Sequence, residues 1–307
     1  MNVGPTSGGE LLTTQRTRFE LWLGMVVFGR LYTVLICDLP AHGFGVDWTC
    51  HTRIHDIPSY LWVEILFYGP VIWFALFQLN TDVFGDVPAD PLSLRRHRRR
   101  QLVGAAASAV FFYGVGIHAA DLIEVLSRER EGITDGAVYE LAYYLDEGLS
   151  HYVQFVSLFF LLGWFVIFDR RGRTDRRHLA LFFGVAHGVE RGLGIIEGEK
   201  WFLGPAVIVW MAAAVWLRWR RVGAAVLDEF LVHYAVAFIL LLPTTQAAYY
   251  LWLGEFTPPS NLDDDTYIRL MILTAGLTIA GTGAVIAFDR RLLHRRDRVH
   301  PPVGGGT

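Results

Sequence analysis

The sequence predicts an all-α integral membrane protein, built as a bundle of about eight transmembrane helices. Of its 307 residues, 53% are hydrophobic and only 19% are charged. This balance is typical of a polytopic membrane protein rather than a soluble domain. Apolar runs long enough to cross a bilayer also recur along most of the chain. The eight predicted spans lie at residues 19–37, 59–79, 102–124, 147–168, 178–196, 202–218, 229–253 and 268–288.

Arginine clusters alternate along the chain and predict the orientation of these spans. They lie before the first span, in alternate loops and after the last span, at residues 16–18, 95–100, 170–177, 218–221 and 290–298. The other loops hold only Arg53, Arg128, Arg130 and Lys200. The positive-inside rule then places both termini in the cytoplasm, and an even number of spans agrees with termini on the same side. The same clusters can contact anionic lipids, and no nucleic-acid-binding motif is present.

The chain has one predicted domain, a polytopic membrane domain at residues 16–298 of a cell-membrane protein. We expect residues 1–15 and the glycine-rich tail at 299–307 to be disordered. Cys37 and Cys50 both fall in the first outward-facing connection. An oxidising exterior would permit a disulfide there, but spacing in the sequence does not establish the geometry that such a bond requires.

Three predicted spans each carry a histidine beside a carboxylate, at a spacing that places both side chains on one helix face. An ionisable group at the centre of a membrane helix costs roughly 2.5–3.5 kcal/mol on insertion scales, so three such pairs call for an explanation. The pairs are His118 with Asp121, Glu147 with His151, and His187 with Glu190.

Helix geometry predicts that the three pairs lie at overlapping depths. At a rise of 1.5 Å per residue, His118 lies roughly 24 Å from the cytoplasmic end of its span. His151 lies one turn below the outer edge of its span, and His187 lies near the midplane. We therefore expect the pairs to meet in the outer half of the membrane. Glu124 and Glu197 extend the polar faces of the helices that carry His118 and His187.

A histidine and a carboxylate from each of several helices is how helix bundles form metal centres. Imidazole suits iron, copper and zinc, and carboxylates balance the charge of the ions. The sequence therefore predicts one or two transition-metal ions (Fe, Cu or Zn). The alternative is three hydrogen-bonded pairs that only hold helices together, and the E-x-x-H spacing of soluble di-iron bundles is absent.

Other polar residues are secondary candidates. Asp47, His51 and His55 lie in the first outer loop, where the two histidines would share one helix face or remain solvated. Arg30 and Glu64 fall at similar depths in the first two spans, and Arg191 follows Glu190 directly. These arginines either form buried ion pairs or bind a carboxylate or phosphate of the substrate. The catalytic candidates are therefore Arg30, Glu64, Glu190 and Arg191.

Gly184, Gly188 and Gly192 recur at four-residue steps in the fifth span. They predict a smooth ridge against a tightly packed neighbouring helix, with His187 in a crowded interior.

Isolated residues in the first half of the chain are similar to the C subunit of copper membrane monooxygenases. They are Asp47 and His51, Pro58 and Ser59, His151 and Tyr152, and Gly163 and Trp164. Tyr60 stands where the second histidine of that family's motif would follow Pro-Ser, and four further spans have no counterpart in that family. We therefore assign the chain to no family.

These observations favour a membrane metalloenzyme that acts on a lipid or small hydrophobic substrate from the extracytoplasmic side. Oxidation is favoured over hydrolysis because the predicted site mixes several histidines with carboxylates. The alternative is a transporter that passes protons or divalent cations along the same histidine and carboxylate side chains. The transporter requires polar groups that continue to the inner face, for which His233 is the candidate. A third class is a structural protein whose pairs only fix helix packing.

Overall fold

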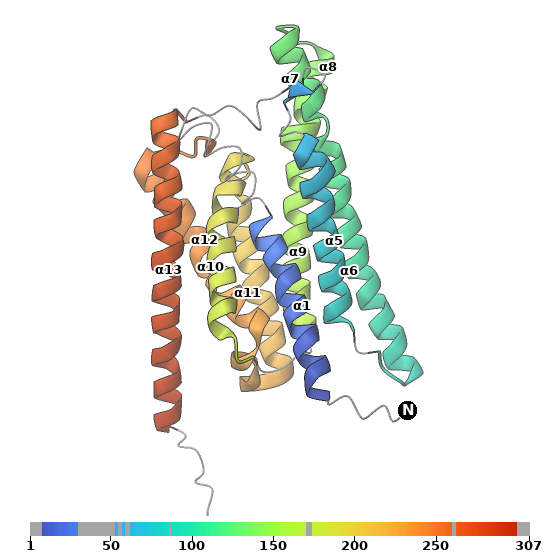
Figure 1. Cartoon of the computed structure of the whole chain (residues 1–307), viewed down its shortest axis with the longest axis vertical. Helices are drawn as coiled ribbons and strands as arrows, with labels where there is room; N and C mark the ends of the chain where they lie inside the picture. Colours follow the sequence, from blue (N-terminus) through green and yellow to red (C-terminus); the bar gives the residue numbers. More distant parts are fainter. Residues whose placement is uncertain are drawn as a thin grey trace, which may run out of the picture.

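The computed structural model is a bundle of long, roughly parallel helices (Figure 1). It describes residues 8–29, 53–54, 57–58, 62–85, 87–169, 174–259 and 262–299. Apart from turns, the regular structure of these residues is helical, with one exception: strands β1 (Arg53–Ile54) and β2 (Ile57–Pro58) form a two-residue antiparallel pair. The predicted all-α class is confirmed.

The helices follow the chain in a simple order. The first half contains α1 (Gly8–Phe28), η2 (Glu64–Tyr68), α5 (Gly69–Val83), α6 (Pro91–His118), α7 (Asp121–Arg130), α8 (Ala137–Tyr143), η3 (Tyr144–Ser150) and α9 (His151–Phe168). The second half contains α10 (Arg177–Glu197), α11 (Leu203–Val222), η4 (Gly223–Asp228), α12 (Phe230–Leu253) and α13 (Asp264–Val299). Segments η2 and η3 are π-helical, and η4 is a 3₁₀-helix.

Among the described residues, five helical segments are long and apolar enough to cross a membrane. They are Pro91–Arg128, Ala137–Phe168, Arg177–Glu197, Phe230–Leu253 and Asp265–Arg290. Each contains or closely overlaps one predicted span, so the chain is a membrane protein in which five of the predicted spans are supported. The predicted spans at 19–37, 59–79 and 202–218 overlap α1, η2–α5 and α11, which pack in the same bundle but are not among these five.

The arginine clusters gather at one end of the bundle. Helices α1, α6 and α10 begin at the lower end of the bundle in Figure 1, and helices α11 and α13 end there. The arginine clusters lie at these helix ends. Ion pairs connect the helices there: Arg18 with Asp82, Arg177 with Asp228, and Arg218 with Glu229. We call this end the arginine end and the other the far end.

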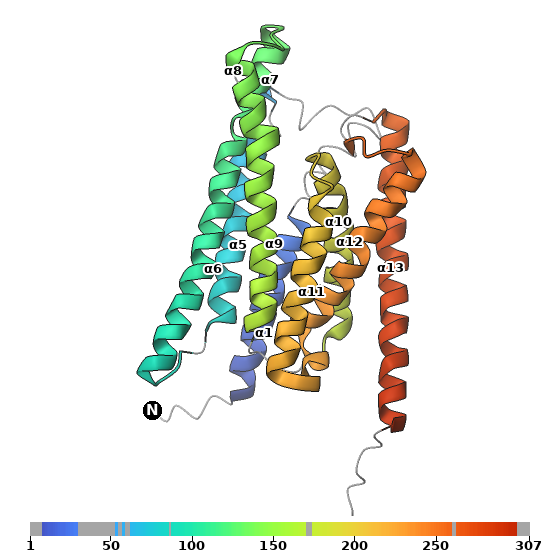
Figure 2. The ribbon, with the colours of Figure 1, turned by 180° about the vertical axis from the view of Figure 1, so that it is seen from behind.

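Helix α9 lies inside the bundle and positions the candidate site. It packs between α6 and α11 and also contacts α5 and α12. Its buried face is almost entirely apolar and includes Leu158, Leu161, Phe165 and Val166. Helix α13 lies at the edge of the bundle, mainly against α10 (Figures 1 and 2). Most of the surface of α13 is therefore available to lipid.

The predicted glycine ridge is present between α10 and α12, which form the most extensive helix contact in the bundle. A methyl group on Gly184 would collide with the backbone of Tyr234. One on Gly188 would lie 3.0 Å from the carbonyl oxygen of Phe238, and one on Gly192 would lie 2.9 Å from a side-chain carbon of α12. Such close approach of two backbones requires residues without side chains, so the ridge fixes which face of α10 meets α12.

We predict that Gly184→Ala destabilises the protein and that Gly276→Ala does not. The first should lower the free energy of unfolding by about 1–3 kcal/mol because α10 and α12 must separate. The second, in α13, has no atom within 4 Å of the added methyl group. It should be neutral or stabilising by up to ~1 kcal/mol through helix propensity. Unfolding of the purified protein by a denaturing detergent measures both, and equal effects would contradict the packing described.

Candidate functional site

Two long helical segments run side by side and carry most of the predicted site residues. The first is α6, which continues into α7 after a short break at Ala119 and Ala120. The second is formed by α8, η3 and α9 without interruption. Helix α6 contacts both α9 and η3, and α7 contacts α8. We call these segments the α6 arm and the α9 arm. In both ribbon views α7 and α8 project beyond α10, α11 and α12 at the far end (Figures 1 and 2).

Residues of two predicted pairs meet where the arms touch. Nδ1 of His118 pairs with a carboxylate oxygen of Asp146 across the two arms. The ring of His151 lies 5.4 Å from that of His118, centroid to centroid. Oε2 of Glu147 lies 3.4 Å from Nδ1 of His151, as the i, i+4 spacing predicted. Both imidazoles and both carboxylates therefore belong to one group of side chains.

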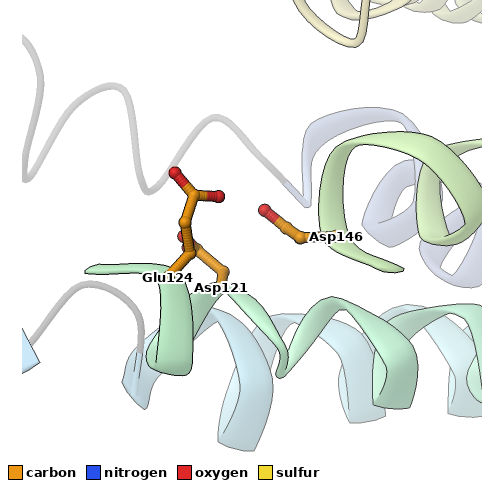
Figure 3. A group of neighbouring side chains, drawn as sticks. All are labelled: Asp121, Glu124 and Asp146. Atoms are coloured by element: carbon orange, nitrogen blue, oxygen red, sulfur yellow. The ribbon is translucent and has the colours of Figure 1, made fainter. Parts of the chain in front are cut away.

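Carboxylates from the two arms also converge. Oxygen atoms of Asp121, Glu124 and Asp146 lie within 4.8 Å of one another. Figure 3 shows the carboxyl group of Asp146 pointing across the gap toward Asp121 and Glu124. Glu124 additionally accepts a hydrogen bond of 3.0 Å from Arg128 and one of 3.4 Å from the hydroxyl of Tyr139. We call the whole group the His–acid cluster: His118, Asp121, Glu124, Asp146, Glu147 and His151.

Asp146 is the member that the sequence did not predict, and the reason is local geometry. In an α-helix the partner of His151 is the residue four positions before it, which is Glu147. Residues 144–150 instead form the π-helix η3, whose wider turn bonds residues five apart and changes which side chains share a face. Asp146 is thereby directed at the α6 arm. The only feature of the sequence that indicates Asp146 is its position directly before Glu147, which places two acids side by side.

His151 has an incompletely satisfied ring. Within the described part of the chain, its buried Nδ1 has no hydrogen-bond partner, since the contact with Glu147 lacks hydrogen-bond geometry. The ring also packs against the C-terminal cap of α10, where a methyl group on Gly198 would lie 3.1 Å from Nδ1. A buried imidazole nitrogen that makes no hydrogen bond and lies 3.4 Å from a carboxylate oxygen has the chemistry of a metal ligand.

The third predicted pair has different neighbours. His187 is fully buried between α10 and α12, and its Nδ1 lies 2.6 Å from the hydroxyl oxygen of Tyr234. Its Nε2 accepts a hydrogen bond of 3.1 Å from Nε of Arg191. An arginine only donates, so Nε2 carries no proton and Nδ1–H donates to Tyr234. Both ring nitrogens are occupied, and a metal ion would have to displace one of these partners.

Arg191 connects this second group to its surroundings. Its Nε lies 2.8 Å from Oε2 of Glu190, and its Nη2 donates to the hydroxyl of Tyr68 over 3.4 Å. We call His187, Glu190, Arg191, Tyr68 and Tyr234 the midplane network. The predicted third pair thus lies in a separate polar group, because the glycine ridge turns that face of α10 toward α12 rather than α9.

The remaining candidates are placed as follows. Glu197 is the last residue of α10, at the far end. Glu64 begins η2, but its side chain is not described, so the predicted pairing with Arg30 stays a prediction. Arg30, Asp47, His51, His55, Cys37 and Cys50 lie outside the described residues. His233 donates from Nδ1 to the carbonyl oxygen of Glu229 over 2.9 Å, and its Nε2 lies 3.6 Å from Asp289 of α13.

Comparison with known proteins leaves the function to be argued from these residues. No protein-family model, no curated protein and no solved structure matches the chain.

We predict that Asp146→Ala destabilises the protein far more than Asp135→Ala. Asp146 is buried and pairs with His118, so its removal leaves a buried imidazole without its partner, at a cost of roughly 3 kcal/mol. Asp135 lies exposed in the turn between α7 and α8 and should change stability by less than about 0.5 kcal/mol. Unfolding in the presence of a chelator measures the difference without any contribution from bound metal. Equal stabilities would contradict the pairing of the two arms.

Proposed function

We propose that the chain is a metal-dependent membrane enzyme that acts on a lipid or small hydrophobic substrate. The observation that carries this proposal is the convergence of two imidazoles and four carboxylates where the α6 and α9 arms touch. A purely structural pairing would need only one acid for each histidine. Here the acids outnumber the histidines, three of them lie within 4.8 Å of one another, and among the described residues the buried Nδ1 of His151 makes an ion contact of 3.4 Å with Glu147 but no hydrogen bond.

We propose that the His–acid cluster would hold one or two transition-metal ions (iron, copper or zinc), around the three carboxylates whose oxygen atoms lie within 4.8 Å of one another. His118 and His151 supply imidazole nitrogens, and Asp121, Glu124, Asp146 and Glu147 supply oxygens. A bound ion would supply Lewis-acid or redox chemistry. The mixture of imidazole and carboxylate favours oxidation over hydrolysis, as it does in the carboxylate-bridged bundles. We infer that His187 belongs to the midplane network and not to this ligand set.

Neighbouring residues of the chain would hold the ligands in position. Asp146 bonds Nδ1 of His118, which fixes the orientation of the imidazole. Arg128 and Tyr139 hold one oxygen of Glu124 and offset its charge. A metal site needs this second layer of contacts, because unsupported ligands do not hold a fixed geometry.

The depth of the cluster supports a substrate drawn from the bilayer. The apolar part of α6 begins at Leu102, so His118 lies ~24 Å along the helix from there. His151 lies ~26 Å from Phe168 at the other end of α9. Both values place the imidazoles just inside the boundary of a hydrocarbon layer of about 30 Å. A lipid could present the bonds nearest its headgroup at this level without leaving the membrane.

We further propose that the far end faces the extracytoplasmic side. The arginine clusters gather at the opposite end, which the positive-inside rule assigns to the cytoplasm. Helices α1, η2–α5 and α11 would then complete eight spans with both termini cytoplasmic.

We predict that the purified protein contains iron, copper or zinc, and that two substitutions remove it. Asp146→Asn and His151→Ala should each lower the metal content by at least about tenfold, as expected for the loss of a ligand or of a residue that orients one. His187→Gln should retain the metal because His187 is occupied by Tyr234 and Arg191. Elemental analysis of monodisperse protein gives the answer. A wild-type protein free of transition metal would refute the proposed enzyme, and loss in His187→Gln would return this residue to the site.

A transporter of protons or divalent cations is the second candidate, and one observation favours it. Two further polar groups occur among the described residues: the midplane network, and His233 with Asp289 nearer the arginine end. The enzyme requires only the cluster, whereas the transporter requires the whole series of groups.

Flux through reconstituted protein separates the two candidates. If the chain is an enzyme, we expect no uptake of protons or divalent cations into proteoliposomes beyond that of protein-free vesicles. The transporter predicts uptake that Arg191→Gln and His233→Gln each abolish, since both substitutions interrupt the series. A control variant, Thr244→Val, alters an exposed hydroxyl on α12 that bonds only to its own helix. Uptake by wild-type protein would therefore replace the enzyme with the transporter.

A further inference from the structure

The chain contains a single lysine, Lys200, among 27 basic residues. Every other basic position holds arginine. A compact ammonium and a planar guanidinium differ in hydration and in the geometry of the groups that they bind. The single lysine of an arginine-rich chain is therefore a candidate for binding that is specific to an amine. The residues around Lys200 show which ligand it could bind.

Lys200 lies beside the His–acid cluster, in the turn between α10 and α11. Its ammonium lies 5.3 Å from the ring centroid of Tyr152, the residue that follows His151. It is close enough to Glu147 to interact with it electrostatically. Two residues earlier, Gly198 packs against the ring of His151. Within the described residues, the ammonium has no ion pair within 4.0 Å, so it is not committed to a carboxylate.

The backbone of this turn has a defined and unusual conformation. Glu199 has a φ of 52°, the only positive value of a non-glycine residue in the described chain. The amide of Glu199 bonds to the carbonyl of Ile196 (2.9 Å), and that of Lys200 to the carbonyl of Ile195 (2.8 Å). This is a Schellman ending, in which glycine normally occupies the position of Glu199. A left-handed glutamate costs roughly 1 kcal/mol, and its conformation fixes the direction in which the chain presents Lys200.

Exposed aromatic residues place the turn at headgroup depth. Trp201 and Phe202 follow Lys200 and are 47% and 46% exposed. Trp201 stacks on Phe256, and Phe202 packs against Tyr152. Exposed tryptophan beside lysine at the end of a membrane helix is typical of the membrane–water boundary. Helix α10 also spans ~30 Å from Arg177 to Glu197, the thickness of the hydrocarbon layer.

We propose that Lys200 binds the phosphate of an anionic lipid headgroup and thereby selects a phospholipid as the ligand of this site. The proposal rests on the proposed metal function in one respect: an unoccupied His–acid cluster would repel a phosphate, whereas metal ions offset the charge of its four carboxylates. The acyl chains would lie along the exposed aromatic side chains, and the headgroup would lie between Lys200 and the cluster.

The uniqueness of Lys200 makes the test specific. The protein is reconstituted in vesicles of phosphatidylcholine alone or of phosphatidylcholine with phosphatidylglycerol, and its amines are acetylated with an uncharged succinimidyl ester. Peptide mass mapping separates Lys200 from the α-amino group. A Val138→Lys variant supplies a reference lysine on α8, at an exposed position of the same end. This reference reports the general effect of a negatively charged membrane surface.

We expect phosphatidylglycerol to slow acetylation of Lys200 on the order of tenfold more than that of the reference lysine, because a charge-assisted hydrogen bond occupies the amine. Equal slowing of the two lysines would overturn the proposal. Protection by inorganic phosphate in phosphatidylcholine vesicles would overturn the lipid assignment and identify a soluble anion instead. Metal content is measured on the same samples. Metal without protection would refute the role of Lys200 alone. Protection without metal would refute the enzyme and the part assigned to the metal in offsetting the carboxylates, and would leave Lys200 as a site for an anionic headgroup.

Discussion

The contact between His118 and Asp146 is the interaction on which the candidate site depends. It joins the α6 arm to the α9 arm through a buried carboxylate and a largely buried imidazole, so loss of either partner is costly. Once the two arms are held there, His151, Glu147, Asp121 and Glu124 are brought to the same place by the helices that carry them. The turn of α10 that packs on His151 then adds Lys200 to one side of the cluster.

A second constraint, the glycine ridge of α10, divides the polar residues of the bundle into two groups. The ridge requires α10 to meet α12, and it turns His187 toward Tyr234 and away from the arms. Arg191 then satisfies the remaining ring nitrogen of His187. One polar group is therefore rich in carboxylates, while the other joins a buried histidine to an arginine and two tyrosines. Their different compositions suit different tasks, ligand binding in the first and helix packing or proton transfer in the second.

Much of the fold could be predicted from the sequence, because apolar runs, arginine clusters and glycine spacing act over single helices. The pairing of Glu147 with His151 followed from the same local rule. Asp146 could not be predicted, since the π-helical turn of η3 changes which residues share a face. The neighbours of His187 depend on how α10 is rotated against α12, which is a property of packing between helices. The sequence predicted a depth for His187 but could not establish the direction in which its ring points.

X-ray absorption at the edge of the bound metal tests the account most directly, because it reports which atoms surround the ion. We predict a first shell of nitrogen and oxygen at about 2.0–2.2 Å. Imidazole scattering should also be visible, and the absorption edge itself should be lost with the metal when His118 and His151 are both replaced by alanine. A shell of sulfur at about 2.3 Å, or imidazole scattering that persists in the double variant, would contradict the proposed ligand set.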